Sequence, residues 1–161
     1  MEKDKTNVMR IADSHKIKYN HYCYKNTDAI SGVDVAKVLN QNPVQVFKTL
    51  VTSARTNEYY VFMIPVAEEL DLKKAAKSVN VKSVEMIKQK DLLPLTGYIH
   101  GGCSPIGMKK QFKTVIDITA KNFDTIIFSA GKIGYQIEMS LDDLSKIIKF
   151  DLYNITKSGE F

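Results

Sequence analysis

The chain has 161 residues, 44% of them apolar and 25% charged, which is typical of one globular domain. No apolar run approaches the roughly 20 residues of a membrane span, and the N-terminus lacks the apolar segment of a signal peptide. We therefore expect a cytoplasmic protein that is not bound to a membrane. The net charge of +5 favours a polyanionic partner, but only mildly.

The first half of the chain is predicted to alternate helices and strands. Helices are expected where apolar residues recur at helical spacing, two of them behind Ser or Asp caps. They cover 4–14, a short stretch from Ser31 to Leu39, and a stretch from Asp71 to Val79. Apolar and aromatic runs predict strands at 18–24, 44–54, 59–66 and 81–86. A polar turn at 55–58 indicates that 44–54 and 59–66 form an antiparallel hairpin.

The second half continues the alternation. A helical turn at 88–95 precedes a glycine-rich loop, and a Ser140 cap opens a helix that runs to Ile148. Strands are predicted at 113–118, 125–128 and 135–139, with one more short strand near the C-terminus. Without a regular βαβ repeat, this order predicts an α/β or α+β fold with a mixed sheet. We expect one domain at 1–156 and a polar C-terminal tail at 157–161.

The glycine-rich loop at 97–107 has the sequence GYIHGGCSPIG and is followed at once by Lys109 and Lys110. Glycine has no Cβ, so backbone N–H groups in such a loop can come close to a ligand. The composition suits a carbonyl oxygen, a phosphate or a ribose. The alternative is a tight connection that merely reverses the chain.

Lys48 lies in the middle of an apolar strand, between Phe47 and Leu50. A buried ammonium is costly unless it is paired or solvated. In the functional interpretation Lys48 points into a pocket and binds substrate. In the structural interpretation it belongs to an edge strand and its stem extends to water.

Several segments together resemble the YbaK family of aminoacyl-tRNA deacylases, relatives of the editing domain of bacterial prolyl-tRNA synthetases. In chain order they are 46–51, 70–77, 84–86, 96–110, 114–117 and 129–134. The resemblance implies a single domain with a mixed, barrel-like β-sheet flanked by helices. It also implies a pocket for the tRNA 3′ end, hydrolysis of mischarged Cys-tRNA(Pro) in trans, and no metal or organic cofactor. Some members of the family associate with prolyl-tRNA synthetase and tRNA.

The resemblance places functional residues at the matching positions. The catalytic set would be Lys48, Gly101 and Gly102: Lys48 binds the terminal phosphate, the ribose or the ester, and amides near the two glycines hold the ester carbonyl. Other pocket residues would bind substrate. These are Tyr22, Ser31, Thr49, Ser104, Pro105, Gly107, Ser129 and Gln136.

Structural alternatives stay open for several of these residues. Tyr22 also suits a half-buried strand, and Ser129 suits a turn. Thr49 faces away from Lys48 in a regular strand, so it would reach a ligand only through a twist or a bulge. Ser31 stands where relatives often carry an aromatic residue, and Gln136 stands where some carry Asp. These departures leave the amino-acid specificity open.

The expected substrate is Cys-tRNA(Pro), and the alternative substrate is Ala-tRNA(Pro). A second alternative is that the protein is not an enzyme but a nucleotide- or RNA-binding module. The attacking group would be the thiol of the substrate, which gives a cyclic thiolactone, or a bound water. Positioning alone lowers a barrier by about 7–11 kcal/mol in favourable cases.

Cys103 and His100 suggest a Cys–His nucleophile, but no third group is evident to orient the histidine. Cys23 and Cys103 are expected to be free thiols, and the histidines show no metal-ligand spacing. A basic helix face is either a solvated surface or a track for tRNA phosphates. It comprises Lys73, Lys74 and Lys77, together with Lys109 and Lys110.

Overall fold

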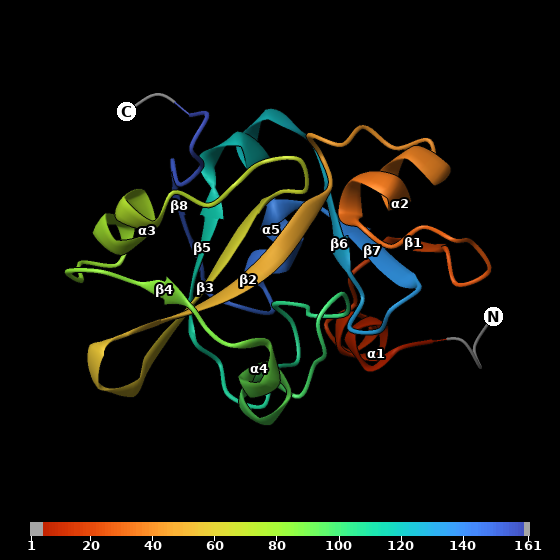
Figure 1. Ribbon diagram of the computed structural model, residues 1–161. Helices are drawn as coiled ribbons and strands as arrows, with labels where there is room; N and C mark the ends of the chain where they lie inside the picture. The colour runs from red at the N-terminus through yellow and green to blue at the C-terminus, as the bar shows by residue number, and fades with distance from the viewer. Residues whose placement is uncertain (1–4, 160–161) are drawn as a thin grey trace.

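The computed structural model describes residues 5–159, within which five α-helices and eight strands form (Figure 1). The strands are β1 (Asn20–Cys23), β2 (Phe47–Ala54), β3 (Glu58–Pro65), β4 (Glu85–Met86), β5 (Lys113–Asp117), β6 (Ile126–Ser129), β7 (Tyr135–Met139) and β8 (Asp151–Tyr153). The helices are α1 (Asn7–Ser14), α2 (Gly32–Val38), α3 (Leu72–Ser78), α4 (Gln89–Thr96) and α5 (Leu141–Ser145). None of the described helices combines the length and apolar character that a membrane crossing requires.

Side-chain caps begin the helices at the predicted places. Ser31 Oγ accepts a hydrogen bond from Asp34 N at 3.1 Å, and Ser140 Oγ makes the same contact with Asp143 N. Asp71 caps α3 in the same way. Such caps satisfy amides that have no partner inside the helix. Thr6 caps α1. The predicted start of this helix at residue 4 lies outside the described residues, as do residues 160 and 161 of the predicted tail.

The strands form two sheets. The larger has the order β4-β2-β3-β5-β8, and the smaller has the order β1-β7-β6. β2 and β3 make the predicted antiparallel hairpin, whereas β3, β5 and β8 run parallel, so the mixed α/β fold is confirmed. A bridge between Val46 and Ile127 joins the sheets. Among the described strands the two sheets do not close into a barrel.

Three strands and the last helix are clearly shorter than predicted: β1 covers only 20–23 of the predicted 18–24, and α5 ends at Ser145 instead of Ile148. β2 begins at Phe47 instead of residue 44, because the preceding residues form a turn in which Gln45 N donates to Asn42 O at 2.9 Å. β4 keeps only Glu85 and Met86 of the predicted 81–86. These differences leave the strand order unchanged.

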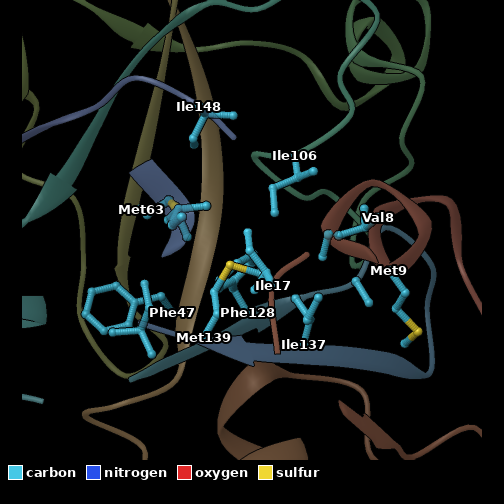
Figure 2. Close-up of a cluster of buried hydrophobic side chains, with 14 of the residues drawn as sticks. Val8, Met9, Ile17, Phe47, Met63, Ile106, Phe128, Ile137, Met139 and Ile148 are labelled. Atoms are coloured by element: carbon cyan, nitrogen blue, oxygen red, sulfur yellow. The ribbon is translucent and has the colours of Figure 1, made fainter. Parts of the chain in front are cut away.

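One apolar cluster packs the two sheets and α1 together (Figure 2). Phe47 and Met63 come from the larger sheet, Phe128 and Ile137 from the smaller, and Val8 from α1. Each is at most 2% exposed, and burial of a side chain of this size contributes about 1.5–3 kcal/mol. The cluster fixes the distance between the sheets and therefore the shape of any space between them.

Candidate active site

A cavity of about 370 Å³ lies between the two sheets. Four segments wall it: the start of β2, the N-terminal end of α2, the glycine-rich loop and the facing ends of β6 and β7. Six of the predicted site residues line it: Ser31, Lys48, Thr49, Gly101, Ser129 and Gln136. The other five, Tyr22, Gly102, Ser104, Pro105 and Gly107, do not line it.

Thr49 and Lys48 reach this cavity from adjacent positions of β2, although the register with β3 is continuous and has no bulge. Val66 N donates to Val46 O at 2.8 Å, and such bonding alternates along an antiparallel pair. The backbone N–H and C=O of Thr49 therefore point away from β3. β4 pairs only with the last part of β2, so within the described structure the edge beside Thr49 is open. An open strand edge can pair with a ligand.

The polar side chains on this edge carry unused hydrogen-bonding capacity. Thr49 Oγ1 is buried and has no partner among residues 5–159. Half-buried Lys48 makes no hydrogen bond or ion pair with the described residues. The pKa of Glu69 is lowered chiefly by the hydrogen bond from Lys157, and the charge of Lys48 makes a smaller contribution in the same direction. Both groups are available to a ligand in the cavity.

The first half of the glycine-rich loop forms another part of the cavity wall. Gly101 lines the cavity at a φ of +88°, a conformation that glycine adopts without strain. Its amide has no partner among the described residues. Gly102 N instead donates to Ile99 O at 3.0 Å, and a Cβ on Gly102 would lie 3.1 Å from Ile133 N. Of the two predicted carbonyl-binding amides, only that of Gly101 is free for a ligand.

The second half of the loop anchors the first. Ser104 is fully buried, and its Oγ accepts a hydrogen bond from Ile106 N at 3.3 Å. Tyr98 donates to Ile106 O at 2.5 Å, and a Cβ on Gly107 would lie 2.8 Å from the hydroxyl of Tyr98. Ser104, buried Pro105 and Gly107 therefore shape the loop from outside the cavity.

The smaller sheet contributes a row of polar residues. Tyr22, Gln136 and Ser129 are opposite one another on β1, β7 and β6. Ser129 Oγ accepts from Gly131 N at 3.0 Å, as a turn serine does. The hydroxyl of Tyr22 donates to Glu138 Oε1 at 2.5 Å. This hydrogen bond is the largest of the causes that raise the pKa of Tyr22 to about 12.

Glu138 is the centre of a hydrogen-bond network on that sheet. Thr125 Oγ1 donates to Glu138 Oε2 at 2.5 Å, and Asn20 and Gln45 approach at 3.4 Å. Burial by itself would raise the pKa of Glu138, but the hydrogen bonds from Thr125, Tyr22 and Asn20 together lower it. The network holds the three strands together and uses the hydroxyl of Tyr22.

Cys103 and His100 both line the cavity. Burial raises the pKa of the Cys103 thiol to about 12, so it stays protonated at neutral pH and is a poor nucleophile. Ser31, as the cap of α2, uses its hydroxyl on Asp34 N. The described residues bring no three His, Cys, Asp or Glu side chains together in a group that could hold a metal ion.

The predicted basic face of α3 is divided. Lys73 and Lys77 are exposed and, with Lys82, line a hollow of about 440 Å³. Lys74 is 4% exposed and turns the other way: its Nζ donates to Thr156 O at 2.8 Å, and also to Gly159 O. Its placement on the phosphate-binding face is therefore wrong. Lys74 holds the C-terminal segment instead.

Comparison with known proteins identifies the family. The model of the aminoacyl-tRNA editing domain matches residues 26–147. The chain is also 44% identical over 153 residues, 94% of this chain and 93% of the relative, to EbsC of Enterococcus faecalis. That protein is named as a Cys-tRNA(Pro)/Cys-tRNA(Cys) deacylase. This chain belongs to the aminoacyl-tRNA editing domain family.

Two solved structures have the same fold as this member of the family. One is the protein APE2540, with a TM-score of 0.85 and 16% identity over 94% of this chain and 100% of that chain. The other is described as a trans-editing enzyme for prolyl-tRNA synthetase, with a TM-score of 0.79 and 16% identity over 95% of this chain and 99% of that chain. The predicted family and fold are confirmed.

Sequence reasoning missed several residues at or beside the cavity. Ile30 lines it and is 89% exposed, although no local pattern marks it. Tyr135 lines it too, with Lys25 and Lys132 at 5.6 and 5.5 Å from its ring centre. Gln41 lies behind the wall and donates to Gln136. The contacts of Tyr135 with Lys25 and of Gln41 with Gln136 join distant parts of the chain, so only the fold reveals them.

Proposed function

We propose that this member of the editing-domain family is a deacylase that acts in trans on mischarged aminoacyl-tRNA, with Cys-tRNA(Pro) as its substrate. The observation that carries the proposal is the cavity between the sheets, where Lys48, Thr49 and Gly101 meet with unused hydrogen-bonding capacity. Family membership and the 44% identical relative, which is named as a Cys-tRNA(Pro)/Cys-tRNA(Cys) deacylase, support the reaction and the amino acid.

The charge of the cavity suits the 3′ end of a tRNA. No Asp or Glu is among the described residues that line it, whereas Lys48 and His100 are. Lys25 and Lys132 flank Tyr135 on the same wall. A phosphate or an ester oxygen is therefore attracted. Lys48 holds the terminal phosphate or ribose, and the Gly101 amide donates to the ester carbonyl as negative charge develops on it.

In this mechanism the thiol of the cysteinyl group attacks its own ester carbonyl. The new S–C bond forms as the C–O bond to the ribose breaks, the ribose oxygen takes up the proton that the thiol loses, and a cyclic thiolactone leaves. Water then opens the thiolactone to free cysteine. No protein nucleophile is required, which agrees with the protonated state of Cys103. The protein contributes positioning and charge stabilisation.

The test is single-turnover deacylation of Cys-tRNA(Pro) by the wild type and by Lys48→Ala. We expect a loss on the order of 100-fold in the variant, with unchanged circular dichroism. Lys121→Ala, which removes an exposed lysine outside the cavity, is the matched control and should keep full activity. Wild-type protein that leaves the ester intact would refute the proposed substrate. Equal rates on Cys-, Ser- and Ala-tRNA(Pro) would refute attack by the thiol and favour water.

The proposed partners are the tRNA and prolyl-tRNA synthetase. Residues 1–156 would form the editing domain, and the exposed lysines of α3 would contact phosphates of the tRNA body. Cross-linking of the protein to tRNA(Pro), with and without the synthetase, measures both contacts. Lys73→Glu combined with Lys77→Glu should weaken tRNA binding and make it less dependent on salt if those lysines contact the phosphates.

A further inference from the structure

Gln41 and Gln136 form a pair of side-chain amides behind the cavity. Gln41 Nε2 donates a hydrogen bond to Gln136 Oε1 at 2.7 Å. Gln136 belongs to β7, lines the cavity and is 5% exposed. Gln41 follows α2, and its backbone N–H donates to Ala36 O at 2.7 Å. The pair therefore ties the end of α2 to the smaller sheet.

This contact gives the Gln136 amide a direction. A glutamine amide has one oxygen acceptor and one NH₂ group with two donors. The oxygen of Gln136 is used by Gln41. Its NH₂ group has no partner among residues 5–159, and Gln136 is part of the cavity wall. The donors of Gln136 are therefore the groups left for a ligand.

The reverse arrangement of the pair is unfavourable. The other terminal atom of Gln41, Oε1, is buried without a partner in the described structure. If the Gln41 amide were turned over, its NH₂ group would take that place, with two donors unsatisfied. Unpaired buried N–H groups are rarer in proteins than carbonyl oxygens with unused lone pairs, because each unmet donor carries a desolvation cost.

We propose that Gln41 is a positioning residue that holds the Gln136 amide with its N–H donors toward the cavity. The part of the substrate bound there then presents a hydrogen-bond acceptor, such as an ester, hydroxyl or thiol group, and a cationic group is disfavoured. This inference rests on the proposed deacylase function. The absence of carboxylates among the described lining residues points the same way, because nothing at this wall neutralises an ammonium.

Which of the two glutamines donates the hydrogen bond can be measured without substrate. Scalar coupling across a hydrogen bond, detected by NMR in the ¹⁵N,¹³C-labelled protein, joins the donor nitrogen to the acceptor carbonyl carbon. We expect coupling from Gln41 Nε2 to Gln136 Cδ. Coupling from Gln136 Nε2 to Gln41 Cδ, or none in either direction, would overturn the proposal.

Single-turnover deacylation of Cys-tRNA(Pro) tests the consequence for substrate. Gln41→Glu supplies only acceptors when ionised, so it should draw the NH₂ group of Gln136 away from the cavity and reduce kcat/KM about tenfold. Acid pH protonates the introduced carboxyl and restores a donor, so the deficit relative to wild type should shrink. Gln41→Leu removes the contact without a charge and should have an intermediate effect.

The matched control is Asn42→Asp, the same amide-to-carboxylate change at the next, exposed position. It should keep wild-type activity. A Gln41→Glu protein that folds and cleaves at the wild-type rate would overturn the proposal. Wild-type protein that cleaves no cysteinyl ester would instead refute the proposed function, and the coupling measurement would still decide the direction of the amides.

Discussion

Four predicted binding residues on the two sheets differ in whether their polar groups already have hydrogen-bond partners. On the larger sheet, β2 presents Lys48 and Thr49 without hydrogen-bond partners among the described residues. On the smaller sheet, Tyr22 and Ser129 already make hydrogen bonds within the protein. All four positions had been predicted to bind substrate. The difference indicates that residues with unsatisfied polar groups are the better candidates for binding, because a satisfied group must first lose a contact.

Glu138→Gln tests most strongly the hydrogen bonds that the smaller sheet already makes. The substitution removes the charge from the hub of the network and should lower the free energy of unfolding by about 1–2 kcal/mol at pH 7, a modest value because the carboxylate is partly exposed. The folded pKa of Glu138 is lowered from 4.5. The stability that it contributes is therefore complete above pH 4.5 and is lost as the pH falls through the folded value.

Urea unfolding of the wild type and Glu138→Gln between pH 7 and pH 3 measures this effect, and the two curves should converge at acid pH. Glu85→Gln, a change at an exposed residue of β4, is the control and should leave stability unchanged. A constant difference between wild type and Glu138→Gln at every pH would contradict the assignment of the charge.

Thr49→Val tests a polar group of the larger sheet that lacks a hydrogen-bond partner among the described residues. It keeps the shape of the side chain and removes a buried hydroxyl that has no partner in the described structure. Stability should stay the same or rise by up to about 1 kcal/mol, while deacylation of Cys-tRNA(Pro) falls about tenfold. Thr52→Val in the same strand is the matched control, because Thr52 Oγ1 donates to Tyr60 O at 3.2 Å. That variant should lose stability and keep activity. Loss of activity in Thr52→Val together with full activity in Thr49→Val would contradict the proposed difference between the two threonines.

Tyr22→Phe should have a smaller effect, about 1 kcal/mol of stability, since it removes one hydrogen bond to Glu138 and keeps the ring. Spectroscopic titration gives a second measurement. The pKa of Tyr22 is raised to about 12, chiefly by that hydrogen bond, and should move toward 10 in Glu138→Gln. A tyrosine titration that is the same in both proteins would contradict the contact.

Ser129→Ala should have the smallest effect on stability, about 0.5 kcal/mol, because within the described structure the Ser129 hydroxyl makes one hydrogen bond, accepted from Gly131 N. Its effect on activity separates the two roles of Ser129. Unchanged kcat/KM with a small loss of stability identifies a turn residue. A tenfold loss of kcat/KM at full stability would show that Ser129 binds the substrate.

Local signals allowed much of the fold to be predicted from the sequence. The caps at Ser31, Asp71 and Ser140 act within a few residues of themselves, so they identified helix starts correctly. The turn at 55–58 likewise identified the β2–β3 hairpin. β4 was overestimated because its pairing with β2 is limited to two residue pairs, which no local pattern reveals.

The site was less accessible to prediction because it depends on contacts between distant segments. The motif at 97–107 marks the loop, yet only the packing of Tyr98 and α1 against Gly107 shows that its second half is an anchor. Lys74 fits a basic helix face by spacing alone, and its burial depends on residues 80 positions and more away. Gln41 carries no motif, and its partner lies 95 positions further along the chain.

The contact between Lys74 and the C-terminal segment has a consequence for biosynthesis. Until residues 151–159 leave the ribosome, β5 has an open edge where β8 will pair, and the Lys74 ammonium lacks the carbonyl oxygens of Thr156 and Gly159. A buried ammonium without such partners is unfavourable by several kcal/mol. The larger sheet therefore reaches its native state only after residues 151–159 have been translated.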